Sequence, residues 1–201
     1  MGDPRKQRKK FSGPTHPWQR VRLDEERQLV DSYGLKKKTE LWKHISFLRH
    51  IKKQAKALIS RRDPQAEKEK GLLIKRLYGL GMVQENASLD NVLELTTPDI
   101  LNRRLQTVVH ARKMANTHGQ ARQFITHQHI VVGEKKVDVP SYLVKRAEEI
   151  VVSFDPTSAL ADEDHPERAK QKVKETQQTA EKARKEKKAE NKEEPAKVEA
   201  A

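Results

Sequence analysis

The chain has 201 residues, with 42 Lys and Arg against 29 Asp and Glu, so its formal net charge is +13. This excess favours a polyanionic partner, nucleic acid first and an acidic membrane surface second. The chain contains no cysteine, which excludes disulfides, thiolate catalysis and cysteine-ligated metal sites and agrees with an intracellular protein. No stretch approaches the roughly 20 apolar residues of a membrane span, and the charged N-terminus lacks the apolar run of a secretory signal.

The positive charge is concentrated near the N-terminus, where residues 1–62 carry 18 basic and 6 acidic side chains. Residues 1–17 combine basic residues with proline and show no apolar periodicity. In isolation such an arm is expected to be disordered, and it could fold against an acidic partner. We therefore expect a basic extended arm over residues 1–20, and we favour RNA contact over a solubilising role.

A helical domain is predicted over residues 21–98, because apolar residues recur there at three- and four-residue spacing. The predicted helices cover 24–34, 39–61 and 65–80, and a short apolar element covers 88–96. Gly34 is expected to end the first helix, and Leu72, Leu73, Leu77 and Leu80 are expected to form the core face of the third.

The helix predicted over 39–61 separates apolar from basic side chains. Its apolar residues fall on one face, and its basic residues fall on the others: Lys43, Arg49, Lys52, Lys53, Lys56, Arg61 and Arg62. Glu40 is its only acidic residue, so the cations have few salt-bridge partners within the helix. An unpaired basic stripe repels itself, and neutralisation by phosphates would remove that repulsion.

A small helix-helix-β-hairpin module is predicted over residues 99–166. Thr97-Pro98-Asp99 carries the features of a helix start, with Thr97 as the N-cap. One helix is expected from there, with Leu101, Leu105, Val108 and Val109 as its buried stripe. Its polar side is expected to hold Arg103, Arg104, Gln106, Thr107 and Arg112.

The second helix of the module is expected to start at Thr117, with Gln120 completing a capping box. Its expected outward residues are Gln120, Arg122, Gln123 and His127, and its expected inward residues are Ala121, Phe124 and Ile125. Strands are expected over 130–132, 135–139 and 150–154. A tight hairpin at Gly133-Glu134, with glycine at the first central position, joins the first two strands.

From residue 167 to 201 the sequence is dominated by Lys, Glu, Ala and Gln and has almost no apolar face. This composition predicts a charged and mostly disordered tail. The expected fold class is therefore α+β: a helical basic N-terminal domain, a small helix-helix-β-hairpin RNA-binding module, and a disordered charged C-terminal tail.

The pattern of polar residues gives little support to catalysis or metal binding. A metal site needs three or four converging ligands, and His127 and His129 have no carboxylate at a suitable spacing. No Gly-rich phosphate loop, nucleophile elbow or paired carboxylate is present. Aromatic residues make up 4% of the chain, too few for a platform that stacks single strands. We expect recognition of backbone and shape, in folded RNA or duplex DNA.

Several motifs of the module resemble the small RNA-binding module named after small-subunit ribosomal protein four. They are Arg104-Leu105-Gln106, Ala121-Arg122-Gln123-Phe124-Ile125, His127-Gln128-His129-Ile130-Val131-Val132 and Pro140-Ser141-Tyr142. RNA-modifying enzymes, a tyrosyl-tRNA synthetase and a heat-shock protein also carry such a module, so the module alone does not identify the family.

Motifs elsewhere resemble the archaeal and eukaryotic branch of the ribosomal protein four family itself. They are Pro17-Trp18-Gln19, Tyr33-Gly34-Leu35, Lys38-Thr39-Glu40-Leu41-Trp42-Lys43, Leu48-Arg49 and Arg103-Arg104-Leu105-Gln106-Thr107. The start Met1-Gly2-Asp3-Pro4 and the later His165-Pro166-Glu167-Arg168 resemble archaeal members. The resemblance covers about residues 1 to 168.

The resemblance implies a structural constituent of the small ribosomal subunit that binds 16S rRNA directly, nucleates assembly of the body and contributes to translational accuracy. It implies a cytoplasmic ribosomal protein that neighbours small-subunit protein five, has no enzymatic activity, cofactor or metal, and forms no homo-oligomer. The expected RNA-binding residues are Arg5, Lys9, Lys10, Trp18, Arg20, Arg22, Lys36, Lys37, Lys38, Lys43, Arg49, Lys52, Lys53, Lys56, Arg61, Arg62, Arg103, Arg104, Gln106, Thr107, Thr117, His118, Arg122, Gln123, His127 and Lys135.

The sequence departs from the family pattern at several positions. Gly133-Glu134 replaces an Asn-Gly hairpin, so a different turn type is expected. Gln128 stands where glycine is usual, and Lys113 stands where a helix-ending glycine is common, so that helix is expected to end differently. His127 is expected to face RNA, whereas His129 could face RNA or pack within the hairpin.

Two other functions remain open from the sequence: an RNA-modifying enzyme that docks through the module, and a basic DNA-compacting protein. The enzyme would need a catalytic constellation that residues 1–96 do not show. A DNA-compacting protein would prefer duplex DNA to structured rRNA in a competition at matched salt. The competition is needed because charge alone cannot separate DNA from RNA. For the ribosomal reading, Arg104→Ala and Arg122→Ala are each expected to weaken rRNA binding with little loss of folding.

Overall fold

The structure is a computed structural model that describes residues 8–162, 165 and 167, so Arg5 and most of the predicted tail lie outside the described residues. The fold is α+β, with helices in the N-terminal part and a small three-stranded sheet after them. By its contacts the chain divides into two units, with the boundary between residues 153 and 154. The expected domain boundaries at 20, 98 and 166 stay predictions.

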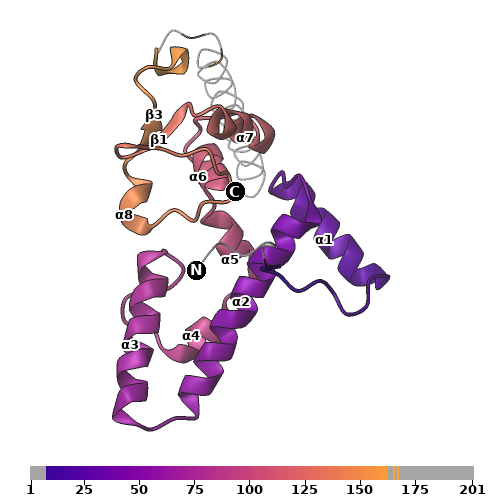
Figure 1. Cartoon of the computed structure of the whole chain (residues 1–201), viewed down its shortest axis with the longest axis vertical. Helices are drawn as coiled ribbons and strands as arrows, with labels where there is room; N and C mark the ends of the chain where they lie inside the picture. Colours follow the sequence, from indigo (N-terminus) through magenta and orange to yellow (C-terminus); the bar gives the residue numbers. More distant parts are fainter. Residues whose placement is uncertain (1–7, 163–164, 166, 168–201) are drawn as a thin grey trace, which may run out of the picture. The chain divides into compact units, whose positions relative to one another are not determined.

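The long helix α2 (Lys38–Ile59) organises the N-terminal part (Figure 1). Four helices pack against it: α1 (Arg20–Ser32), α3 (Pro64–Gly79), α4 (Leu89–Glu94) and α5 (Thr97–Asn102). The buried residues of α2 recur at three- and four-residue spacing, as the apolar pattern predicts: Leu41, His44, Leu48, Ile51, Ala55 and Leu58. All the helices predicted in this part are present, with ends shifted by up to about four residues.

The predicted core face of α3 is partly wrong. Leu73 and Leu77 are buried, whereas the Leu72 side chain is 67% exposed. Successive helical residues are rotated by about 100°, so Leu72 lies beside the stripe that Leu73 and Leu77 share and not on it. Ile59, predicted on the apolar face of α2, is also exposed, because it is the last residue of the helix.

Gly34 ends α1 as predicted. Its backbone has φ +57, and Leu35 N–H donates to Val30 O at 2.9 Å, which is the hydrogen bond of a Schellman motif. A Cβ atom at position 34 would lie 2.6 Å from the Cβ of His118. Glycine therefore serves two purposes here, because it allows both the left-handed turn and the close approach of the later module.

The single helix predicted from Thr97 is wrong in its extent and in its cap. Thr96 is the N-cap, with a capping box to Asp99, and the helix stops at Asn102 before α6 (Leu105–Ala111) begins. Between them the backbone bonds to another segment: Val144 N–H donates to Arg103 O at 2.9 Å, and Leu105 N–H donates to Tyr142 O at 2.8 Å. These tertiary hydrogen bonds replace those of a continuous helix.

Helix α7 (His118–Thr126) packs against α6 and leads into strand β1 (Ile130–Val132). Thr117 caps α7 as predicted, because its side chain accepts from Gln120 N–H at 3.2 Å. The reciprocal bond differs: the Gln120 carboxamide accepts from Asn116 N–H at 2.7 Å, one residue before the N-cap. The cap is therefore present, but it is not the predicted capping box.

The hairpin after β1 joins it to β2 (Lys135–Lys136), with Val132 opposite Lys135. Gly133 has φ +64, whereas Glu134 is not among the described residues with positive φ. Glycine therefore occupies the first central position of the turn, as predicted. An Asn-Gly turn would have a positive φ at both central residues, so the turn type differs. Strand β2 ends before the predicted Val139, because the chain turns toward α6 and Gln106 N–H donates to Pro140 O at 3.4 Å.

Two non-glycine residues hold left-handed backbone where the family pattern has glycine. Lys113 has φ +58 after α6, and Gln128 has φ +61 after α7. Met114 N–H donates to Val109 O at 3.1 Å and His129 N–H donates to Phe124 O at 2.9 Å, so both helices end in Schellman motifs. The expectation that α6 ends differently at Lys113 is therefore wrong.

After the hairpin come α8 (Arg146–Glu149) and β3 (Val152–Phe154), and the sheet order is β2-β1-β3. In the second unit, Asp155 accepts from Thr157 Oγ1–H at 2.8 Å, and Ser158 caps the short helix η1 (Ala159–Ala161). No helix within the described residues is long and apolar enough to cross a membrane.

Candidate nucleic-acid interface

One side of α2 carries four cations: Arg49, Lys52, Lys53 and Lys56. We call this set the α2 basic face. Their spacing of three, four and seven residues places them on one side of the helix, away from the buried stripe that includes Leu48 and Ala55. Lys52 is half-buried and the other three are exposed.

The α2 basic face has no carboxylate partner among the described residues; its one polar contact is a 3.5 Å hydrogen bond from Arg49 to Ser12. Each of its four cations lies three or four residues from another of the set. Like charges at such spacing destabilise a helix by about 0.2–0.5 kcal/mol per pair. A row of anions such as RNA phosphates would convert this repulsion into attraction.

Most of the other predicted RNA-binding residues are accessible. Those exposed are Lys9, Lys10, Trp18, Arg20, Lys36, Lys37, Lys43, Arg61, Arg62, Thr117, Gln123, His127 and Lys135. Those half-buried are Arg22, Lys38, Arg103, Thr107, His118 and Arg122. The distribution leaves cations available on the arm, on α2 and on the hairpin.

Arg104 and Gln106 are not on the polar side of α6, and this prediction is wrong. Their exposed fractions are 1% and 0%. The break between α5 and α6 turns both side chains inward, where Arg104 Nη2 donates to Gln106 Oε1 at 3.4 Å. The expectation that Arg104→Ala costs little folding is contradicted by this burial, because a buried and hydrogen-bonded guanidinium contributes to the core.

Glu40 is the centre of the polar cluster that holds Arg104. Its carboxylate accepts from Arg104 Nη2 at 3.0 Å and from both terminal nitrogens of Arg122, at 3.0 and 3.2 Å. Burial alone would raise the pKa of Glu40, but the hydrogen bonds from Arg122 and Arg104 outweigh it and lower that pKa. The ionised Glu40 therefore links α2 to Arg104, the N-cap of α6, and to Arg122 in α7.

His44, one turn after Glu40, completes the cluster. Arg104 Nη1 lies 3.0 Å from His44 Nε2, and because a guanidinium only donates, that nitrogen accepts as part of a neutral ring. Burial, reinforced by the charge of Arg104, lowers the pKa of His44 to about 4. We call Glu40, His44, Arg104, Gln106 and Arg122 the Glu40 cluster.

Gln106 and His118 extend this connection toward α1. Gln106 Nε2 donates to Gly34 O at 3.1 Å and to His118 O at 2.8 Å. The His118 ring stacks on His110 with 4.1 Å between centroids, and burial, followed by the neighbouring His110, lowers the pKa of His118. His118 thus lies at a packed junction.

Three other predicted contact residues are engaged by carboxylates. Arg22 and Lys38 both pair with the buried Glu26, the latter at 3.4 Å, and Arg103 Nη1 donates to Glu149 Oε2 at 2.7 Å. The Arg103 side chain is 13% exposed. These pairs leave the three cations less available to phosphate than the α2 basic face.

The two histidines of the His-Gln-His motif differ in their surroundings. His127 is the C-cap of α7 and is exposed. His129 is half-buried, and its ring meets Phe124 edge-on with 6.3 Å between centroids. Packing against Phe124 favours the structural alternative for His129. Within the described residues no group of three or more His, Cys, Asp or Glu is placed to hold a metal ion.

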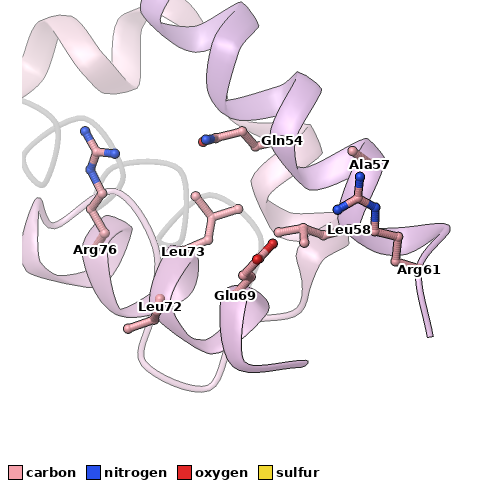
Figure 2. A pocket seen from close by; sticks show the side chains of 8 residues that line it. All are labelled: Gln54, Ala57, Leu58, Arg61, Glu69, Leu72, Leu73 and Arg76. Atoms are coloured by element: carbon pink, nitrogen blue, oxygen red, sulfur yellow. The ribbon is translucent and has the colours of Figure 1, made fainter. Parts of the chain in front are cut away.

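A hollow of about 390 Å³ lies between α2 and α3 (Figure 2). Its lining combines leucines with charged residues: Gln54, Ala57, Leu58, Arg61, Glu69, Leu72, Leu73 and Arg76. The exposed side of Leu72 borders this hollow, so the residue that misses the core lines a surface depression instead.

Sequence reasoning missed Glu40 and Glu26 as organising residues. Glu26 is one of three consecutive acidic residues, and nothing in its spacing distinguishes it from Asp24 and Glu25. Glu40 is the only acidic residue of a helix rich in cations, and helical spacing shows only that it offers them few salt bridges. Glu40 lies four residues before His44, so it falls on the same side of α2 as the apolar stripe. This spacing was the available signal that Glu40 faces the rest of the protein. Its partners Arg104 and Arg122 are 64 and 82 residues away, so only the tertiary fold brings them to it.

Comparisons with known proteins agree with this arrangement. The S4 domain family matches residues 103–150, which lie within the predicted module and include the break at Arg104, helix α7 and the hairpin. The chain therefore contains an S4 domain, a class of RNA-binding module.

Relatives match most of the chain. Small ribosomal subunit protein uS4 of Ignicoccus hospitalis is 48% identical over 79% of this chain and 95% of its own length. The proteins of the same name from Picrophilus torridus and Methanococcus aeolicus are 47% and 48% identical, over 83% and 84% of this chain and 92% and 96% of their own lengths. The chain belongs to the small ribosomal subunit protein uS4 family.

Proposed function

We propose that this chain is a structural constituent of the small ribosomal subunit that binds 16S rRNA directly, in the cytoplasm and without enzymatic activity. The observation that carries the proposal is the α2 basic face, whose four cations lack carboxylate partners among the described residues. The names of the relatives, small ribosomal subunit protein uS4, support the ribosome as the place of action.

The exposure of the predicted RNA-binding residues also supports two different roles for them, one direct and one indirect. Exposed cations of the arm, of α2 and of the hairpin contact phosphates, which fix position on the RNA. The buried Arg104 and Gln106 act indirectly, because they hold α2 and the S4 domain in one geometry. A fixed relation between the α2 basic face and the exposed polar residues of the S4 domain selects an RNA that presents phosphates at matching places, which is recognition by shape.

Three finer roles follow from the family resemblance and are part of the proposal. The protein nucleates assembly of the body of the subunit, contributes to translational accuracy, and contacts small-subunit protein five. A direct binder that contacts RNA through both α2 and the S4 domain is suited to an early assembly role, because it can organise RNA segments before other proteins arrive.

The test is the rRNA affinity of the full chain after removal of charge from the α2 basic face. Lys53→Gln with Lys56→Gln is compared with a control pair, Lys68→Gln with Lys75→Gln, which removes the same charge from exposed positions of α3. The first pair should weaken binding and reduce the slope of log affinity against log salt by about 1 to 2, because two phosphate contacts are lost. Equal affinity and slope in both pairs would contradict the assignment.

The alternatives of a DNA-compacting protein and an RNA-modifying enzyme predict different results. In the same salt, a DNA-compacting protein would prefer duplex DNA of equal length to the folded rRNA. An RNA-modifying enzyme would change the nucleoside composition of the bound RNA during incubation with a group donor. Folded rRNA bound in preference to duplex DNA, with its nucleoside composition unchanged, is the result that the ribosomal function predicts.

A further inference from the structure

Trp18 stands apart from the other aromatic residues because its side chain is 89% exposed. Tryptophan has the largest apolar surface of all side chains, and folded proteins usually bury most of it. A single exposed apolar residue needs no explanation by itself. The contacts of the preceding backbone supply the second observation.

The turn that carries Trp18 is held by an arginine from the next helix. Arg22 Nη2 donates to His16 O at 3.0 Å and to Pro17 O at 2.8 Å, so the two carbonyls before Trp18 are fixed from one side chain. The other terminal nitrogen of Arg22 bonds to Glu26, whose exposed fraction is 4%. The backbone just before Trp18 is therefore held by a buried carboxylate through an arginine.

Glu26 is itself fixed to α2. Trp42 Nε1 donates to its carboxylate at 3.0 Å, and Lys38 Nζ lies 3.4 Å from it. The Trp42 ring contacts Phe11 of the arm, with 6.1 Å between centroids. A chain of contacts thus runs from α2 to the backbone just before Trp18, and a ring presented on fixed backbone loses less conformational entropy when it binds a ligand.

The charged residues that neighbour Trp18 in sequence indicate which kind of ligand it takes. Arg20 follows two residues later, and 94% of its side chain stays accessible although its Nε lies 4.0 Å from Asp24. The exposed Lys9 and Lys10 precede Trp18 in the arm, and the first turn of α1 contains no acidic residue. An exposed apolar ring in a basic segment suits a ligand that combines a flat aromatic group with negative charge, which describes a nucleotide better than an apolar protein surface.

We propose that Trp18 is a stacking surface for one unpaired nucleobase of the bound RNA. The proposal rests on the rRNA-binding function above and adds a base contact to phosphate contacts that carry no sequence information. One aromatic ring is enough to stack one base, so the proposal is compatible with a chain in which only 4% of the residues are aromatic. Base stacking tolerates any base, so Trp18 selects an unpaired position in the RNA and not a particular base.

The test uses the purified full chain and the five-prime domain of small-subunit rRNA, with no other protein present. Trp18→Ala should weaken binding by about 5- to 150-fold, the range that base–aromatic stacking gives on alanine substitution. The salt slope should not change, because no charge is removed. Trp18→Phe should retain most of the affinity, and Trp18→Leu, which is apolar without a ring, should lose it.

Val21 provides the control, because it is 67% exposed and lies three residues from Trp18. Val21→Ala should bind as the unmodified chain does. Tryptophan emission gives a second readout, since stacked bases quench it. RNA should quench part of the emission of the unmodified chain and leave that of Trp18→Phe, in which only Trp42 emits, nearly unchanged.

Unchanged affinity of Trp18→Ala, or equal affinities of Trp18→Leu and Trp18→Phe, would overturn the stacking proposal while rRNA binding stands. If the unmodified chain itself shows no preference for the rRNA over a scrambled RNA, the proposed function fails, and the stacking proposal fails with it. The two failures are therefore distinguishable in one titration series.

Discussion

Removing the carboxylate of Glu40 should destabilise the fold strongly, although Glu40 is part of a polar cluster and not of the apolar core. The change leaves Arg104, which is 1% exposed, without its ionic partner. Stranding a buried charge in this way costs about 3–5 kcal/mol. The pair with Arg122 adds about 0–1 kcal/mol, because 27% of the Arg122 side chain is exposed and water screens it.

A loss near 3 kcal/mol is expected for Glu40→Ala, because Arg104 keeps its hydrogen bonds to His44 and Gln106. The assay is urea unfolding at pH 7, compared with Glu85→Ala as a control at an exposed loop position. The control should change the free energy of unfolding by less than about 0.5 kcal/mol.

The cause of the loss can be tested by a second substitution. If Glu40→Ala destabilises because it strands a charge, then adding Arg104→Met should recover part of the stability, since an apolar side chain of similar size needs no partner. If the loss came from packing alone, the second substitution would add to it. Equal stability of Glu40→Ala and the Glu85→Ala control would refute the reasoning.

Three further predictions concern pH and backbone. His44 has a folded-state pKa of about 4, below its usual 6.5, so its contribution is present above pH 6.5 and is lost as the pH falls toward 4. Urea unfolding should show a loss of up to about 3 kcal/mol from this group. His44→Gln should reduce the loss of stability at low pH, of which His118 keeps a share because its pKa is also lowered, and an identical pH profile for that variant would contradict the prediction. Gln128→Gly should raise the free energy of unfolding by about 0.5–1 kcal/mol, because glycine adopts the left-handed backbone of this position without steric strain. A lower urea midpoint would argue against this prediction. Gly34→Ala should lower the thermal midpoint, at a cost of about 2–4 kcal/mol from the left-handed φ and the contact with His118, and an unchanged midpoint would show that the contact relaxes freely.

Periodicity predicted the local structure well because local structure depends on neighbours in sequence. The apolar stripe of α2 and the glycine of the Gly133 hairpin are visible in short windows, and the structure confirms both. The same reasoning failed at the break between α5 and α6. There the apolar spacing continues through Arg104, but backbone hydrogen bonds to residues 142–144 interrupt the helix.

The candidate site was predictable where residues act through exposure and charge, and it was not predictable where they act through burial. The cations of α2 could be assigned to the surface from their helical spacing alone. Arg104 could not be assigned to the core, because an arginine is buried only when a partner compensates its charge. That partner, Glu40, lies in a different helix, and sequence spacing carries no information about the contact.

The central claim is specific recognition of folded small-subunit rRNA, and filter binding tests it most directly. The purified full chain is titrated with the five-prime domain of archaeal small-subunit rRNA at fixed near-physiological salt, with a scrambled RNA of equal length as competitor. The account predicts tight binding that survives the competitor. Equal loss of binding to both RNAs would mean that the +13 charge of the chain attracts any polyanion, and it would contradict the account.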